Sequence, residues 1–210
     1  MCNSGVGLTP TVDSRVHHFS AGGLYNGLVL LIDDESKTYW DHITGAAVHG
    51  PLTGAQLDQW GIQMTTAGAL KEQEPKRQES DLLVYRSHPS LWSRALGWFM
   101  NLPFLSAKFP PGFRRTMSDV DTRLDEMSIG LGVVTRSTQR FYPKDRIGVE
   151  IGAGIEDEID GRELRVQIGE LDAVPSAVWS DGTRPLQLFS RWYGFSLTYP
   201  GCEVYSATLR

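Results

Sequence analysis

Turn signals between short apolar runs are the feature of this sequence that most restricts its fold. The clearest one lies at Asp160-Gly161, between the runs Ile155–Ile159 and Leu164–Ile168. An Asp-Gly pair favours the type I′ turn of a two-residue hairpin. In the second run every other residue is apolar, as expected for a strand with one buried face. The sequence therefore predicts an antiparallel hairpin here.

Similar runs recur over most of the chain, and each is bounded by Gly, Pro, Asp or Ser residues. Leu28–Ile32 is apolar throughout, which predicts a buried central strand. A second hairpin is predicted at Val178–Trp179 and Leu186–Phe189, around Asp181-Gly182. The other predicted strands are Val6–Val12, Arg15–Phe19, Lys37–Ile43, Ala46–Val48, Leu57–Met64, Leu82–Tyr85, Ile129–Val134, Gln139–Tyr142, Tyr193–Thr198 and Cys202–Ala207.

This pattern predicts a mainly β, β-rich α+β fold: one antiparallel β-sandwich or barrel-like domain with a short helical insertion. A length of 210 residues suits one domain, so residues 1–210 are predicted to form it. The best predicted helix is Ser90–Asn101, which has a capping serine and an apolar stripe. It lies in a polar, irregular stretch, residues 65–127, which is predicted to be a partly helical insertion.

Composition excludes several classes of function. Twenty basic residues against twenty-five acidic ones give a net charge of −5, without a basic run, so no nucleic-acid partner is expected. No apolar stretch reaches the length of about eighteen residues that a transmembrane helix needs. The N-terminus has no signal-peptide pattern, which predicts a cytoplasmic location for the chain as written. The aromatic stretch Trp92–Phe104 suits either contact with a membrane surface, a lid, or ordinary core packing.

A metal or redox site can be assembled from the chain's first fifty residues. His42 and His49 flank a Thr44-Gly45 turn, so a hairpin there would bring them to neighbouring strands. With Cys2 they would offer thiolate and imidazole ligands, which suit zinc or copper, and Asp41 could join them or orient them. None of the common short metal-binding spacings is present, so the competing interpretation is a set of ordinary turn and strand histidines.

Three further features of the sequence have ordinary structural interpretations. His17 and His18 are adjacent in a predicted strand and should point to opposite faces, so they should not share a site. The acidic run Asp33-Asp34-Glu35 falls in a predicted turn, which indicates solvated surface charge. The glycine pair Gly130 and Gly132 lacks the third glycine and the strand–helix context of a phosphate-binding loop.

Two other functions compete with the metal site. If Met1 is removed, Cys2 would be an N-terminal catalytic nucleophile with its own α-amine as base, as in cysteine amidohydrolases. Alternatively, the absence of a strong catalytic motif favours a non-enzymatic β-rich module that binds a ligand or a protein. The candidate ligand-binding residues for such a module are Tyr25, Asn26, Tyr39, Trp40, Arg191 and Trp192.

Several stretches resemble a prokaryotic family catalogued as domain of unknown function 3179 (DUF3179). The most specific is the block from Tyr39 to Gly54, which contains the Trp, Thr-Gly and Gly-Pro elements. The others are Cys2-Asn3-Ser4-Gly5-Val6-Gly7, Phe19-Ser20-Ala21-Gly22-Gly23-Leu24-Tyr25-Asn26, Phe141-Tyr142-Pro143 and Arg191-Trp192-Tyr193-Gly194-Phe195-Ser196. The resemblance spans nearly the whole chain and implies no reaction, because the family has no settled activity.

The resemblance also bears on the N-terminus. Members of the family often open with a Cys-x-x-Cys element that follows a strand, and Cys2 matches its second cysteine. Either the natural start lies upstream, or this member has lost the pair and with it the basis of a dithiolate site. The open edge that a first strand at residue 2 would leave favours the upstream start. An upstream start would also leave the cellular compartment open.

Overall fold

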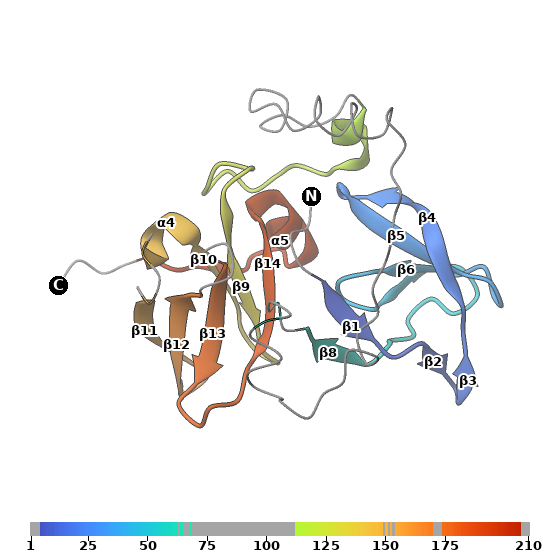
Figure 1. The fold of residues 1–210 in the computed structure, drawn as a ribbon. Coiled ribbons are helices and arrows are strands. Elements are labelled where there is room, and N and C mark those ends of the chain that lie inside the picture. Colours follow the sequence, from blue (N-terminus) through green and yellow to red (C-terminus); the bar gives the residue numbers. More distant parts are fainter. Residues whose placement is uncertain are drawn as a thin grey trace. The chain divides into compact units, whose positions relative to one another are not determined.

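The structure is a computed structural model, and it describes residues 5–62, 64, 68, 112–148, 150, 152, 154–169 and 174–206 (Figure 1). The chain divides into two compact units, residues 1–63 with 116–210, and residues 64–115. The sheets below belong to the first unit. The predicted strand Leu82–Tyr85 and the predicted helix Ser90–Asn101 lie outside the described residues. The single domain with an insertion at residues 65–127 stays a prediction.

The N-terminal part of the first unit forms three antiparallel sheets. Its central one is a meander in which each strand pairs with the next along the chain: β4 (Phe19–Tyr25), β5 (Leu28–Asp33), β6 (Tyr39–Asp41) and β7 (Ala47–His49). Two smaller sheets are β1 (Val6–Leu8) with β8 (Gln59–Gly61), and β2 (Thr11–Val12) with β3 (Arg15–Val16). Leu28–Ile32 is central as predicted, but Val29 is 42% exposed, so the strand is not buried on both faces.

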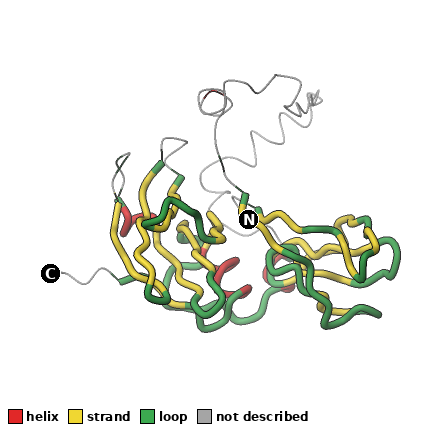
Figure 2. The backbone as a smooth tube through the Cα atoms, turned by 90° about the horizontal axis from the view of Figure 1, so that it is seen from below, coloured by secondary structure: helices red, strands yellow, loops and turns green. Residues whose placement is uncertain are grey.

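The C-terminal part contains two sheets and short helices, which Figure 2 colours yellow and red. The first sheet has the order β14 (Leu186–Arg191), β9 (Ile129–Val134), β10 (Gln139–Pro143) and β15 (Glu203–Val204). The second has the order β11 (Gly154–Ile159), β12 (Arg162–Ile168) and β13 (Pro175–Trp179). The helices of this part are α4 (Lys144–Ile147) and α5 (Trp192–Thr198), and the short helix η2 (Phe113–Thr116) spans the end of the second unit and the first residue after it.

These two C-terminal sheets share one apolar core. Side chains of β9, such as Leu131 and Val133, lie in the same buried cluster as Leu164 and Val166 of β12. Packing of sheet faces explains why alternate residues of these strands are apolar. The strand-rich, mainly antiparallel fold is thus confirmed. The described sheets are all open, without a closed barrel, and β15 pairs with β10 in parallel.

The predicted hairpin at Asp160-Gly161 is confirmed. Strands β11 and β12 pair antiparallel with Ile159 opposite Arg162. Asp160 and Gly161 both have positive φ angles, 52° and 74°, as a type I′ turn requires. The second predicted hairpin is wrong, because β13 pairs with β12 and β14 pairs with β9, in the other sheet. A turn signal fixes the local chain reversal but not the strand with which each arm then pairs.

The predicted strand Tyr193–Thr198 is also wrong, since these residues belong to helix α5. The helix buries its aromatic residues, and Trp192 and Phe195 pack against Phe141 at ring distances of 5.2 and 5.4 Å. A Cβ atom on Gly132 of β9 would lie only 2.0 Å from the Phe195 ring. Helix α5 therefore packs against a strand residue without a side chain, Gly132, which is distant in the sequence. A local aromatic pattern does not reveal this contact.

Candidate metal centre

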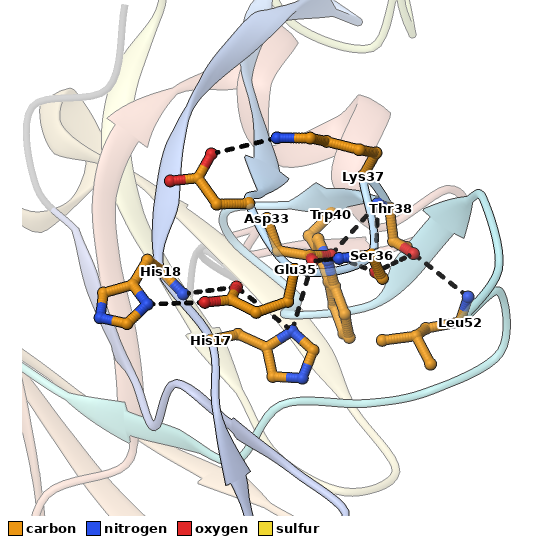
Figure 3. A network of polar contacts seen from close by, with 10 residues as sticks. His17, His18, Asp33, Glu35, Ser36, Lys37, Thr38, Trp40 and Leu52 are labelled. Atoms are coloured by element: carbon orange, nitrogen blue, oxygen red, sulfur yellow. Dashed lines mark hydrogen bonds and ion pairs between the residues drawn. The ribbon is translucent and has the colours of Figure 1, made fainter.

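A compact group of polar side chains surrounds the end of strand β5 (Figure 3). Asp33 is the last residue of β5, Glu35 lies in the turn that follows, and His17 lies between β3 and β4. Strands β4 and β5 are antiparallel neighbours with Phe19 opposite Asp33. The backbone N–H of Asp34 continues this pairing by donating to the carbonyl of His18 at 2.9 Å. Sheet pairing therefore brings the His17 segment across from the Glu35 turn.

Asp33 is the centre of the group, and its side chain is completely buried. Its Oδ2 accepts hydrogen bonds from Trp40 Nε1 at 2.8 Å, Ser36 Oγ at 2.7 Å and the backbone N–H of Thr38 at 3.2 Å. Its Oδ1 accepts from the backbone N–H of Ser36 and faces His17 Nδ1 at 3.3 Å. Burial by itself would raise the pKa of Asp33, but these donors outweigh it and hold the pKa far below its ordinary value.

The separations around His17 suit the ligands of a metal ion. His17 Nδ1 lies 3.3 Å from Asp33 Oδ1 and 3.8 Å from Glu35 Oε2, and ligand atoms of all three residues lie within 4.8 Å of one another. A direct charged N–H···O bond is normally shorter, about 2.7–2.9 Å. Zinc bonds of about 2.0–2.1 Å in tetrahedral geometry separate neighbouring ligand atoms by about 3.3–3.4 Å. The His17–Asp33 distance is that of a long hydrogen bond and also fits the ligand spacing of such a metal site, whereas the His17–Glu35 distance is somewhat longer than that spacing.

Glu35 is held in place by His18. The backbone N–H of His18 donates to Glu35 Oε2 at 2.9 Å, and His18 Nδ1 contacts Glu35 Oε1 at 2.6 Å. The side-chain hydrogen bond lowers the pKa of Glu35 and raises the pKa of His18. The His18 side chain is exposed, so the group opens to solvent on this side. In both carboxylates the oxygen that faces His17 also accepts one backbone N–H, from Ser36 for Asp33 and from His18 for Glu35, and the other oxygen is held by side-chain donors. Outer-shell hydrogen bonds of this kind orient metal ligands elsewhere.

The structure locates three of the four residues predicted to bind metal. Asp41 Oδ1 accepts the backbone N–H groups of Ile43 and Thr44, both at 2.8 Å, and so closes the turn after β6. His42 follows in that turn, where burial lowers its pKa. His49 lies opposite Tyr39, at the other end of the β6–β7 pair.

Asp41, His42 and His49 form no metal-type group of three in the described part of the chain. Cys2 lies outside the described residues. The site built on Cys2, and its role as a catalytic nucleophile, therefore stay predictions.

The residues predicted to bind a ligand have varied surroundings. Tyr25 is 51% exposed, whereas Trp40 and Trp192 are completely buried. The two tryptophans use their indole N–H groups within the protein, Trp40 toward Asp33 and Trp192 toward the carbonyl of Asp121. The others take part in polar or ring contacts: Asn26 accepts hydrogen bonds from Ser118, Arg191 donates to the carbonyl of Met127, and the Tyr39 ring lies 6.2 Å from the His49 ring. Their ligand-binding role stays a prediction.

Comparison with known families settles the resemblance found in the sequence. Residues 1–177 match the model of a family described as "Protein of unknown function (DUF3179)". The chain belongs to this family. Searches of curated proteins and of solved structures gave no match. Because the function of this family is unknown, a function for this member has to be inferred from the geometry of its site.

Sequence reasoning missed His17 and Glu35 in this DUF3179 protein. The prediction that His17 and His18 point to different sides agrees with their exposure, because His17 is buried and the His18 side chain is exposed. They lie between strands β3 and β4 rather than in a strand, however, and both approach Glu35. The acidic run was interpreted as solvated charge, but Asp33 is fully buried. The sequence contained one signal, a histidine pair and an acidic turn at the ends of consecutive strands. Only the register in which these strands pair brings the two together.

Two further expectations concern membranes. No helix in the described part of the chain has both the length and the apolar character to cross a membrane. The stretch Trp92–Phe104, which suited a lid or a membrane-surface contact, lies outside the described residues. That contact stays a prediction.

The second cysteine, Cys202, gives a test of the native packing. Its side chain is buried, and burial raises the pKa of the thiol to about 11. Since the thiolate is the reactive form, Cys202 should resist iodoacetamide at about pH 8 while the protein is folded. A Cys2→Ser variant leaves Cys202 as the only thiol. Mass spectrometry should find it unmodified in buffer and fully modified in guanidinium chloride; rapid alkylation in buffer would contradict the buried position.

Proposed function

We propose that this DUF3179 protein binds one divalent transition-metal ion, with zinc favoured, through His17, Asp33 and Glu35. The observation that carries the proposal is the placement of a buried imidazole nitrogen 3.3 Å from a fully buried carboxylate oxygen and 3.8 Å from a second carboxylate. One imidazole with two carboxylates suits zinc, manganese or iron better than a thiolate-preferring ion such as copper(I).

Charge gives a second reason for a bound cation. Two carboxylates converge on one imidazole, and one of them, that of Asp33, has no contact with solvent. A buried carboxylate is costly unless it is paired or coordinates a metal. The nearby Lys37 is exposed and forms its ion pair with Asp34 instead. A dication between the three ligands would balance the charge and replace the long His17–Asp33 contact by two metal–ligand bonds.

The number of ligands indicates what kind of centre this would be. Structural zinc sites are closed by four protein ligands, whereas three protein ligands leave a position for water or an outside ligand. Glu35 is 38% exposed, so the open position would face solvent on its side. The other two functions predicted from the sequence are a binding module, whose candidate residues include Arg191 and Trp192, and an N-terminal nucleophile at Cys2. Both stay predictions.

The test is zinc binding by the wild-type chain and by a His17→Ala variant, purified without a His tag. Isothermal titration calorimetry and elemental analysis should give about one zinc per chain for the wild type. His17→Ala should bind zinc about 100-fold more weakly, because it removes a ligand rather than an outer-shell group, for which losses of about 10- to 100-fold are typical. His49→Ala is the matched control, since His49 lies on β7 away from the group. Equal zinc affinity of the two variants, or no zinc binding by the wild type, would refute the proposal.

A further inference from the structure

We propose that His18 determines which metal ions this centre accepts, by holding Glu35 as a ligand with a single available oxygen. This inference rests on the proposed function, because it concerns the preference of the same site. His18 would touch neither the ion nor its outside ligand, so it would act as a positioning residue.

The first step is the use of the two oxygens of Glu35. Oε1 contacts the ring nitrogen Nδ1 of His18 at 2.6 Å, a separation typical of a strong charge-assisted hydrogen bond. Oε2 accepts the backbone N–H of His18 at 2.9 Å and is the oxygen that faces His17. Figure 3 shows both contacts reaching Glu35 from the same residue. Of the two oxygens, only Oε2 is therefore directed toward an ion at His17.

The second step is the matching use of Asp33. Its Oδ2 accepts three donors, from Trp40, Ser36 and Thr38, whereas its Oδ1 accepts one backbone N–H, from Ser36, and is the oxygen that faces His17. The Asp33 carboxylate is therefore also limited to one oxygen. It is fixed by buried groups of strand β6 and the preceding turn, whereas Glu35 is fixed by an exposed imidazole. The hydrogen bond between the His18 side chain and Glu35 can therefore be removed without disturbing the core.

The consequence is a low coordination number. Calcium takes six to eight oxygen ligands, often with bidentate carboxylates, and magnesium requires octahedral oxygen geometry. Two single oxygens and one imidazole nitrogen instead leave a four-coordinate ion with one outside ligand, the geometry that zinc prefers. Released from His18, Glu35 could offer both oxygens or turn toward solvent. The site would then favour larger, more highly coordinated ions such as manganese.

The experiment compares the wild type with His18→Ala and His18→Gln, at one pH near 7.5. Zinc and manganese affinities are measured by competition, and cobalt(II) is used as a spectroscopic probe because four-coordinate cobalt absorbs visible light far more strongly than six-coordinate cobalt. His18→Ala should bind zinc about 10- to 100-fold more weakly, with a smaller loss or a gain for manganese, and should lose the intense cobalt bands. His18→Gln, whose amide N–H can again donate to Oε1, should recover much of both.

The outcomes separate the two proposals. If the wild type binds neither zinc nor cobalt, the proposed function fails and the inference fails with it. If the wild type binds zinc but His18→Ala keeps its zinc-to-manganese ratio and its cobalt spectrum, the inference alone is overturned. The His18 side chain is 76% exposed, so the variants should unfold at the wild-type temperature without metal. A merely structural role for His18 would change that temperature and leave the metal preference unaltered.

Discussion

Replacing Asp33 with alanine is expected to lower the free energy of unfolding by about 3–5 kcal/mol. The change would remove the acceptor of two side-chain donors, Trp40 Nε1 and Ser36 Oγ, and of the backbone N–H groups of Ser36 and Thr38. Trp40 and Thr38 are completely buried, so their N–H groups would remain without water. Each buried donor left unsatisfied costs about 1–3 kcal/mol. Urea unfolding followed by fluorescence, in EDTA to remove metal, measures the change.

The neighbouring residue provides the control for this prediction. Asp34 is 61% exposed and pairs with the exposed Lys37 at 3.5 Å, so Asp34→Ala should change stability by less than about 0.5 kcal/mol. Asp33→Asn should fall between the two. Its amide keeps one acceptor oxygen, but the NH₂ group that replaces the other oxygen faces donors that need an acceptor. If Asp33→Ala were as stable as Asp34→Ala, the buried network would not contribute to folding.

Replacing Gly132 with alanine should destabilise the C-terminal sheets by about 3 kcal/mol. An added Cβ would lie 2.0 Å from Phe195 Cε2 and 2.3 Å from Cδ2, and Phe195 is fully buried in helix α5. Relief would require the helix to move away from β9, which would open the packing of Phe195 against Phe141. Thermal unfolding of the variant should show the loss as a lower midpoint temperature.

Gly61 is the matched control for Gly132. It also lies in a strand, β8, but the nearest atom to an added Cβ would be the Pro185 carbonyl oxygen at 3.9 Å, an ordinary contact. Gly61→Ala should therefore leave the midpoint within the range of a neutral surface change, about 0.5 kcal/mol. Equal effects of the two substitutions would show that the close approach of Phe195 does not require a glycine at position 132.

The candidate site depends on contacts between residues that are distant in the sequence. The sequence contains His17, His18 and an acidic run that begins fifteen residues after His18, and each has an ordinary interpretation by itself. Which of these side chains meet depends on the register of β4 against β5, where Phe19 lies opposite Asp33. A shift of one residue would turn every side chain of the strand to the other face. The metal-type group thus follows from long-range pairing.

The strand-rich class of this protein, the Asp160-Gly161 hairpin and membership of DUF3179 can all be predicted from the amino-acid sequence. These features depend on the backbone preferences of adjacent residues, or on short sequence motifs that the family shares. Only the tertiary structure decided that Trp192–Thr198 is a helix and that His17, Asp33 and Glu35 converge. In both cases the deciding contact comes from residues distant in the chain, and the free energy of burying aromatic rings or satisfying a buried carboxylate exceeds the small preferences of the local sequence.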